Sequence, residues 1–168
     1  MRIGLLSDTH GWIHPGLVKF FAECDEIWHA GDIGNLETAD SLSSIKPLRA
    51  VYGNIDNAAV RSEYPEKLRF RAGDVNVFIT HIGGTPGNYD RRIRDELMAS
   101  PPDLFICGHS HIAKIMFDKK GGFLYVNPGA AGYIGFHKIM TAARFTIDSK
   151  SITGMEIIEL GERGRVEQ

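Results

Sequence analysis

The chain has 168 residues, which fits one domain, and its 43% hydrophobic and 24% charged residues exclude an obligately disordered chain. A formal net charge of −2 argues against a broad cationic surface for nucleic acid. The two cysteines are too few for a disulfide framework, whereas the seven histidines indicate a site that uses imidazole. Because no apolar run has the length of a signal-peptide core or a membrane span, we expect a cytoplasmic protein without membrane contact.

The first half of the chain predicts strands that alternate with helices. The expected elements are a strand at 2–6, a helix opened by Pro15, a strand at 26–30, a helix at 36–45 and a strand at 47–52. Such alternation is typical of parallel strands joined by helical crossovers.

The second half predicts mainly hairpins. Strands at 67–71 and 75–80 flank a Gly-Asp turn, and a helix at 88–99 precedes a strand at 104–107. Two antiparallel pairs follow, at 113–117 with 123–126 and at 140–147 with 152–160. The whole pattern predicts an α/β (α+β) fold with a mixed sheet, or two sheets with helices outside. We expect a single domain over residues 1–160 and a C-terminal tail at 161–168.

Five of the predicted strands are followed directly by carboxylate, amide or imidazole side chains. These clusters are Ser7-Asp8-Thr9-His10, Gly31-Asp32-Ile33-Gly34-Asn35, Gly53-Asn54-Ile55-Asp56, His81-Ile82-Gly83-Gly84 and Gly108-His109-Ser110-His111. Sites in α/β folds lie at the carboxyl ends of strands. Side chains two apart on an extended segment point the same way, so we expect Asp8 to converge with His10, and His109 with His111.

The candidate ligands offer oxygen and imidazole nitrogen but no thiolate: Asp8, His10, Asp32, Asn54, His81, His109 and His111. This mixture suits Mn²⁺, Fe or Zn²⁺ better than a structural zinc ion. Seven ligands are too many for one ion, but they suit two ions about 3.5–4 Å apart that share a carboxylate. Taken singly, each cluster also fits a helix cap, a turn or a core histidine. We expect Gly31, Gly53 and Gly108 to let the backbone turn sharply beneath the metals.

The five clusters resemble the five blocks of the calcineurin-like metallophosphoesterases: Asp8-x-His10, Gly31-Asp32-x-x-Gly34, Gly53-Asn54-x-Asp56, His81 and Gly108-His109-x-His111. The short length and the Gly-Asn-x-Asp form are similar to the small YfcE-like phosphodiesterases of bacteria and archaea. The resemblance extends from Met1 to about Leu160. It implies a four-layer αββα sandwich of two mixed sheets flanked by helices, the metallo-dependent phosphatase fold. It also implies a binuclear centre holding two divalent ions, with manganese first and iron, zinc or nickel as alternatives.

The resemblance also implies a role for each block. One ion would be held by Asp8, His10 and His111. The other would be held by Asn54, His81 and His109. Asp32 would bridge both ions, and the residues expected to serve catalysis are Asp32, Asn54 and Asp56. For Asp56 the expected role is to orient a ligand such as a histidine, and a turn-stabilising role is the alternative.

Two positions depart from the family pattern. Many larger members carry a histidine directly after the asparagine of the third block, where it assists the leaving group. Here that position is Ile55, which cannot donate a proton, and this disfavours efficient hydrolysis of alkyl phosphate monoesters. Ile82 stands where glycine is common, and we expect it to narrow the approach to the second metal. Asn127-Pro128-Gly129 resembles the family segment that returns to the rim of the site, and a plain turn is the alternative.

The remaining histidines and a run of arginines have simpler interpretations. We expect His29 to be a core residue or to support a ligand, and His14 and His137 to lie at the surface or rim. Arg91, Arg92 and Arg94 fall on a predicted helix and most simply form its solvated face. If that helix borders the cleft, a contact with substrate phosphate is the alternative.

Together these observations predict a metal-dependent phosphoesterase, most simply a phosphodiesterase of a small phosphodiester or nucleotide-like substrate. The mechanism would be in-line attack on phosphorus by a hydroxide that bridges two ions. One alternative is a non-catalytic scaffold on the same fold, as in the phosphoesterase-like subunit of eukaryotic retromer. Another is a metal hydrolase of a non-phosphate ester or amide. The net charge of −2 disfavours a nuclease with an extended nucleic-acid surface, and a homo-oligomer is left open.

Overall fold

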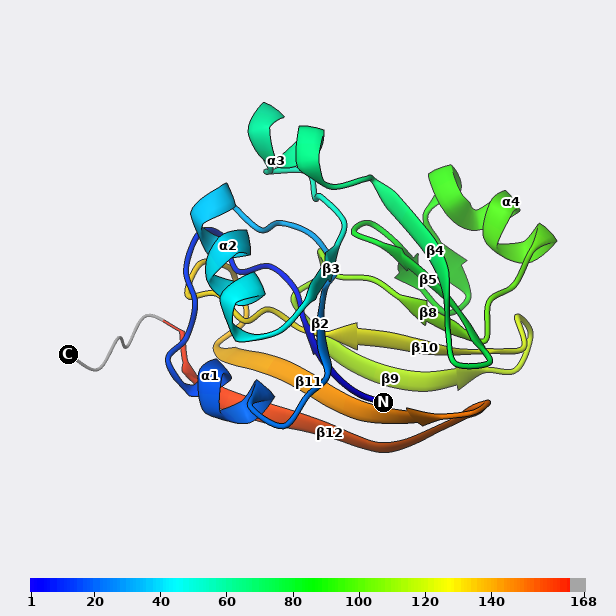
Figure 1. The fold of residues 1–168 in the computed structure, drawn as a ribbon. Coiled ribbons are helices and arrows are strands. Elements are labelled where there is room, and N and C mark those ends of the chain that lie inside the picture. The colour runs from blue at the N-terminus through cyan, green and yellow to red at the C-terminus, as the bar shows by residue number, and fades with distance from the viewer. Residues whose placement is uncertain (164–168) are drawn as a thin grey trace.

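Two five-stranded sheets form the centre of the computed structural model, which describes residues 1–163 (Figure 1). The first sheet contains β1 (Arg2–Leu6), β2 (Glu26–His29), β3 (Leu48–Ala50), β11 (Ile139–Asp148) and β12 (Ser151–Glu162). Its order is β12-β11-β1-β2-β3. Strands β1, β2 and β3 are parallel to one another, and β11 is antiparallel to both of its neighbours, β1 and β12. The parallel pairing confirms the crossover pattern expected from the first half of the chain.

The second sheet contains β4 (Lys67–Ala72), β5 (Val75–Thr80), β8 (Leu104–Ile106), β9 (Ala113–Asp118) and β10 (Phe123–Pro128). Its order is β4-β5-β8-β10-β9. The central strands β5, β8 and β10 are parallel, and the two edge strands join them as antiparallel hairpins. Both sheets are therefore mixed, as the family resemblance implies.

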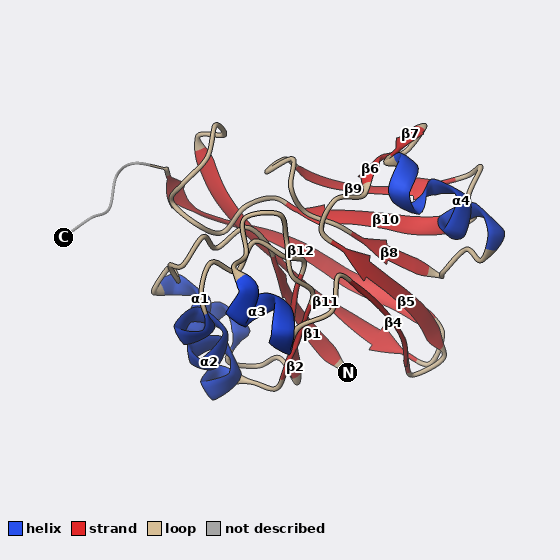
Figure 2. Cartoon of the chain, turned by 90° about the horizontal axis from the view of Figure 1, so that it is seen from above, coloured by secondary structure: helices blue, strands red, loops and turns tan. Residues whose placement is uncertain are grey.

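Helices cover the outer faces of both sheets. The first sheet is covered by α1 (Gly16–Phe21) and α2 (Leu36–Ile45), beside which lies the short α3 (Ala58–Glu63), and the second by α4 (Arg91–Ala99). Figure 2 shows α1, α2 and α3 gathered on one side of the strands and α4 on the other. The expected four-layer αββα sandwich is confirmed.

Three apolar layers hold the sandwich together. Between the sheets, buried side chains such as Ile3, Trp28 and Ile79 pack into one cluster. Amphipathic helices then bury Phe21 against the first sheet and Leu97 against the second. Burial of this kind contributes roughly 25 cal/mol per Å² of apolar surface, so the layers rather than single bonds stabilise the fold.

One helical prediction needs correction, and one helix was not predicted. The helix expected at 88–99 begins only at Arg91, because Asn88 and Tyr89 form β7 (Asn88–Tyr89) and pair with β6 (Gly84–Thr85). Asp90 ends this pairing and caps the helix by accepting a 2.9 Å bond from the Arg92 N–H. Helix α3 has no counterpart among the predicted elements.

The carboxyl ends of β1, β2, β5 and β8 meet where the two sheets adjoin. The Asp8 N–H donates to Gly31 O at 2.9 Å, which joins the loops after β1 and β2. The Gly108 N–H donates to His81 O at 3.0 Å, which joins the loops after β8 and β5. The His109 N–H donates to Oδ2 of Asp8 at 3.2 Å and links the two sheets. Four of the five polar clusters thus converge.

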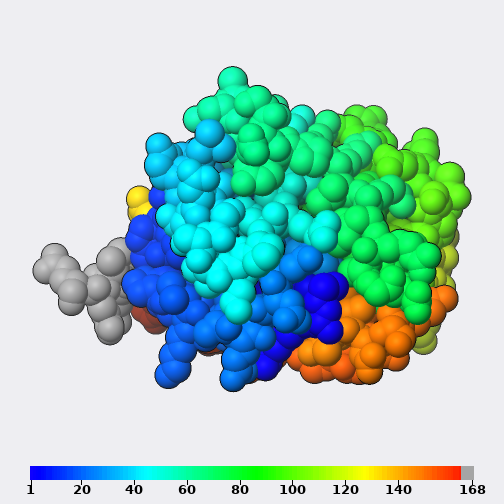
Figure 3. Space-filling model, in the orientation of Figure 1, coloured from blue at the N-terminus to red at the C-terminus, as the bar shows by residue number. Residues whose placement is uncertain are grey.

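The first half of the chain, coloured blue to green, forms most of the face drawn in Figure 3, and the orange part of the β11–β12 hairpin borders it. Within residues 1–163, no helix has the length and apolar character needed to cross a membrane. Of the tail expected at 161–168, Gly161 and Glu162 belong to β12, whereas residues 164–168 lie outside the described part of the chain.

Candidate metal centre

One group of possible metal ligands contains Asp8, His10 and His111, whose ligand atoms lie within 4.8 Å of one another. Nε2 of His111 lies 3.0 Å from Oδ1 of Asp8 and 3.4 Å from Nε2 of His10. Asp8 is fully buried, and both rings are partly buried. This is the set that the family resemblance implies for one metal ion.

A second group contains Asp32, His81 and His109, again within 4.8 Å. Nε2 of His81 lies 3.2 Å from Oδ2 of Asp32, and the rings of His81 and His109 meet edge to face at 5.2 Å. Asp32 and His81 are buried, whereas His109 is exposed and opens the group to solvent.

The two groups lie next to each other. Oδ1 of Asp8, in the first group, is 3.9 Å from Nε2 of His81, in the second. Within residues 1–163, both of these buried atoms lack a hydrogen-bond partner. A buried polar atom without a partner costs roughly 1–3 kcal/mol, so native proteins keep few of them without a functional reason. Carboxylate oxygens and imidazole nitrogens fit a divalent cation, which would give both atoms a partner.

The electrostatics differ between the rings of the site. Burial opposes the charge of His81, but its contact with Asp32 and the charges of Asp8 and Asp32 outweigh burial and raise the pKa of His81. Burial lowers the pKa of His10 and His109 despite the nearby charge of Asp8. Burial opposes ionisation of Asp32, but the adjacent His81 ring and the bond from the Ile55 N–H outweigh it and hold the pKa of Asp32 below its ordinary value. Neutral imidazole and carboxylate are the forms that ligate a metal ion.

The backbone brings these side chains together differently from the sequence prediction. Five non-glycine residues in the two groups have φ between 51° and 67°: Asp8, His10, Asp32, His109 and His111. Asp8 and His10 do converge, but through left-handed backbone and not through alternation along an extended segment, whereas His109 and His111 belong to different groups. Left-handed backbone costs an L-residue roughly 1–2 kcal/mol, and such strain gathers at functional sites. The surrounding loops must therefore hold it in place.

A buried histidine supports the loop after β1. Nδ1 of His29 accepts from the Gly31 N–H at 3.1 Å, so its Nε2 donates to Oγ1 of Thr9 at 2.9 Å. Thr9 in turn donates to Ile33 O at 2.9 Å. Thr9 lies between Asp8 and His10, so this chain of bonds fixes the loop that carries both.

Asp56 holds the loop after β2 against the loop after β3. Its carboxylate accepts from the backbone N–H groups of Ile33 at 3.1 Å, Gly34 at 2.6 Å and Gly53 at 2.7 Å. These bonds favour the turn-stabilising alternative over the orientation of a histidine. Asn127 plays a similar part for the loop after β8, since its Nδ2 donates to Gly108 O at 2.8 Å.

Of the three glycines expected to permit sharp turns, Gly31 has a φ of +92°. The other two are needed for space. A Cβ at Gly53 would overlap Asp32, and a Cβ at Gly108 would overlap Ser7 and Asp8. These glycines let the strands' loops close onto the carboxylates.

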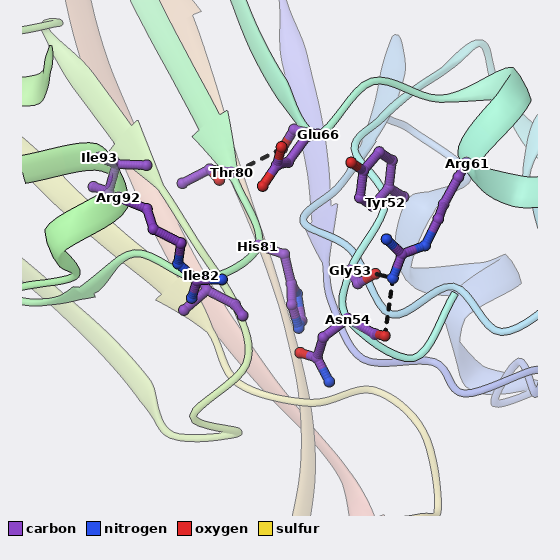
Figure 4. A pocket seen from close by; sticks show the side chains of 10 residues that line it. All are labelled: Tyr52, Gly53, Asn54, Arg61, Glu66, Thr80, His81, Ile82, Arg92 and Ile93. Carbon is purple, nitrogen blue, oxygen red and sulfur yellow. Dashed lines mark hydrogen bonds between the residues drawn. The ribbon is translucent and has the colours of Figure 1, made fainter. Parts of the chain in front are cut away.

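A pocket of about 160 Å³ opens beside the second group and is lined by both His81 and Asn54 (Figure 4). Arg61 and Arg92 lie on opposite sides of it, with His81 and Asn54 between them. Ile82 lines this pocket and also the neighbouring pocket that contains His109. It therefore lies beside the second group, where it was expected to narrow the approach. Helix α4 thus borders the cleft through Arg92.

The two arginines are held by protein acceptors. Arg61 donates to the carbonyl oxygens of Asp56 at 2.7 Å and Asn54 at 3.0 Å. Arg92 donates twice to the Asp90 carboxylate, at 2.9 and 3.1 Å. Both side chains are therefore oriented in advance, and each keeps N–H groups that these bonds do not use.

Sequence reasoning missed two residues near the groups. Thr9 stands inside the first cluster but carries no ligand signal of its own. Arg163 lies where a tail was expected, and its Nη1 reaches Nδ1 of His111 at 3.1 Å. No sequence pattern marks Arg163, because the contact joins residues 52 positions apart.

The chain matches a known sequence family over most of its length. The sequence model of the calcineurin-like phosphoesterase superfamily domain matches residues 1–150. A probable metallophosphoesterase of Methanocaldococcus jannaschii is 29% identical over 137 residues, which cover 77% of this chain and 68% of that protein.

Solved structures share the fold at lower identity. An archaeal protein described as a novel phosphodiesterase superposes with a TM-score of 0.71 at 21% identity, covering 95% of this chain and 99% of that one. The Vps29 protein of Entamoeba histolytica, solved in complex with Zn²⁺, gives a TM-score of 0.72 at 16% identity and covers 96% and 100% of the two chains.

Proposed function

The chain belongs to the calcineurin-like phosphoesterase superfamily, and on this premise we propose that it is a metal-dependent phosphodiesterase with a binuclear centre. The observation that carries the proposal is the pair of adjoining ligand groups, each with one buried carboxylate and two histidines. Their shared boundary, Asp8 Oδ1 to His81 Nε2, measures 3.9 Å. Two such groups in contact suit a two-ion site better than a single structural ion.

The residues divide the work as follows. Asp8, His10 and His111 would hold one ion. Asp32, His81 and His109 would hold the other, with Asn54 as a further ligand, and the charge of Asp32 would serve both ions. When bound, two divalent ions supply a hydroxide near neutral pH for in-line attack and neutralise charge on the phosphoryl oxygens. Manganese is the first candidate, with iron, zinc and nickel as alternatives.

The chain's own groups position the ligands. The Nδ1–H of His81 donates to Ala30 O at 2.8 Å, and its Nε2 faces Asp32. The Ile55 N–H holds Oδ1 of Asp32 at 3.0 Å and so fixes the carboxylate plane. Orientation of this kind by supporting bonds typically changes metal affinity or activity by about 10- to 100-fold.

The pocket beside the second group favours a small phosphodiester as substrate. Arg61 and Arg92 place positive charge on its two sides, which suits the phosphate and anionic leaving groups of nucleotide-like esters. Ile55 offers no proton to a leaving alkoxide, so esters with good leaving groups should react best. The net charge of −2 is compatible with this substrate, because the bound ions bring the positive charge.

The test is hydrolysis of bis-p-nitrophenyl phosphate by the purified chain, first treated with a chelator and then assayed with and without Mn²⁺. We expect turnover only after Mn²⁺ is restored. Equal turnover in both samples, or none in either, would refute the proposal. Inhibition by orthophosphate distinguishes a phosphoesterase from a hydrolase of carbon esters or amides.

A further inference from the structure

Arg163 contacts a residue of the first ligand group from the far end of β12. Its Nη1 lies 3.1 Å from Nδ1 of His111. The same guanidinium donates to the carbonyl oxygens of Ile134 at 3.0 Å and Ala130 at 3.3 Å. Gly135 is pressed against this contact, since a Cβ there would overlap both Arg163 and the His111 ring. Both Nη atoms of the guanidinium are therefore hydrogen-bonded, and Nη1 is packed against Gly135, whereas the buried Nε has no hydrogen-bond partner among residues 1–163.

The contact fixes which nitrogen of His111 carries the ring proton. A guanidinium can only donate, so Nδ1 of His111 accepts, and the proton of the neutral ring stays on Nε2. Nε2 is the nitrogen that faces the ligand group, 3.0 Å from Oδ1 of Asp8 and 3.4 Å from Nε2 of His10. A nitrogen that carries a proton has no lone pair to offer a metal ion.

His81 in the second group has the opposite arrangement. Its Nδ1–H donates to the carbonyl oxygen of Ala30 at 2.8 Å, so the proton on Nδ1 is retained and Nε2 is the nitrogen left for a metal ion. A ring proton given to a backbone carbonyl is the usual state of a metal-ligating histidine. The two groups have the same ligand types but differ in the partner of the histidine Nδ1, which is a hydrogen-bond donor at His111 and an acceptor at His81.

We propose that Arg163 holds the Asp8, His10 and His111 group in a form that excludes a metal ion, so that this group loads only when the guanidinium leaves His111. The inference rests on the proposed metal-dependent function and adds its regulation. On release, Nε2 gives its proton to solvent and Nδ1 takes one up, so the ring stays neutral and can ligate. The Asp32, His81 and His109 group loads first, and Arg163 acts as a positioning residue that weakens the second binding step.

The variant test is a calorimetric titration of Mn²⁺ into three chelator-treated proteins: wild type, Arg163→Met and Arg144→Met. Arg144 is a matched control, because its guanidinium also donates to a backbone carbonyl, Phe20 O at 3.0 Å, but contacts neither ligand group in doing so. We expect two steps in the wild type. In Arg163→Met the weaker step should tighten by about tenfold or more, because no charged hydrogen bond must be broken. The stronger step, and both steps of Arg144→Met, should not change.

A second measurement needs no variant. Long-range ¹H–¹⁵N NMR of the metal-free wild type should show His111 protonated at Nε2 and His81 protonated at Nδ1. Protonation of His111 at Nδ1, or equal Mn²⁺ affinities in wild type and Arg163→Met, would overturn the role of Arg163 while leaving the metal centre intact. If Mn²⁺ bound to none of the three proteins, the proposed function would fail, and this inference with it.

Discussion

At the scale of single residues, Asp32 has the most demanding position in the site. One oxygen accepts from the Ile55 N–H at 3.0 Å, and the other lies 3.2 Å from His81. The carboxylate is buried, so water screens its charge little and the charge depends on neighbouring groups. A cation next to a buried carboxylate gains far more than it would in water.

Asp32→Asn keeps the shape of the side chain and removes its charge. We expect it to lower bis-p-nitrophenyl phosphate turnover at least about 100-fold and to reduce bound manganese at both groups. Metal content by mass spectrometry and steady-state kinetics check this. Asp103→Asn, on the surface and bound to Asn76, is the matched control that should keep both. Full activity with two metal ions in Asp32→Asn would contradict the shared role.

His29 makes stability depend on pH. Burial lowers the pKa of His29 from 6.5 to about 4. Between these values the unfolded chain binds a proton that the folded chain does not, so the folded state loses stability as the pH falls from about 6.5 to 4. The loss amounts to about 3 kcal/mol once the pH reaches the folded value.

Urea unfolding with chelator present, at pH 7.5 and at pH 4.5, measures this loss. We expect the non-titrating variant His29→Gln to lose about 2 kcal/mol less than wild type over this interval. Other carboxyl groups titrate in both proteins, so only the difference between them reports on His29. Identical pH dependence in the two proteins would show that His29 is not held neutral.

The residue types of the site could be predicted because they follow apolar runs in a fixed order, and their chemistry is local to each short cluster. The backbone at Asp8 and His10 could not be predicted, since left-handed φ values of 55° and 51° are imposed by bonds from the loop after β2. Arg163 likewise had no local signal, because the carbonyl oxygens that accept its hydrogen bonds belong to Ala130 and Ile134, which are distant in the sequence.

At the scale of elements, the loops after the strands are tied to one another rather than to their own strands. Asp56, after β3, accepts three backbone N–H groups from the loops after β2 and β3. A carboxylate with three such bonds acts as a clamp. Asp32, the proposed metal ligand, lies on one of these loops, so the bonds to Asp56 also help to fix its position.

Asp56→Asn separates the clamp from a direct catalytic role. The amide is uncharged and accepts at one oxygen only, so all three N–H groups lose a charged acceptor and at least one loses its acceptor altogether. We expect a loss of about 1.5–3 kcal/mol in the free energy of unfolding. At saturating Mn²⁺ the kcat should fall less than about tenfold, because bound metal ions stabilise the native conformation of the loop that carries Asp32. Unchanged stability with a kcat reduced by several hundredfold would instead indicate that Asp56 acts on substrate.

Strong apolar runs made most elements predictable, as for α2, whose bounds 36–45 agree with the sequence expectation. Short elements that bury few apolar residues could not be predicted from the sequence. Helix α3 has six residues and buries only Val60, so its periodicity is too short to detect, although Asn57 caps it. The start of α4 was misplaced because the β6–β7 pairing depends on a contact between Gly84 and Tyr89.

At the scale of the whole molecule, each ligand group is shared between the two sheets. The loops after β1 and β2 supply Asp8, His10 and Asp32, and the loops after β5 and β8 supply His81, His109 and His111. The apolar layer between the sheets therefore sets the distance between ligands. Trp28 lies in that layer, fully buried, with its ring 4.9 Å from that of Phe70.

Trp28→Ala should lower the free energy of unfolding by about 3–5 kcal/mol and weaken Mn²⁺ binding, because the cavity lets the sheets shift. Trp28→Phe, which keeps most of the volume, should lose less of both. Urea unfolding and calorimetric titration measure the two effects. Wild-type Mn²⁺ affinity in a strongly destabilised Trp28→Ala protein would mean that the loops, and not the layer, position the ligands.

The most direct test of the central claim is an anomalous-difference map from crystals grown with excess Mn²⁺. The proposed binuclear centre predicts two peaks about 3.5–4 Å apart, one beside Asp8, His10 and His111 and the other beside Asp32, His81 and His109. A single peak, or peaks elsewhere on the molecule, would contradict it.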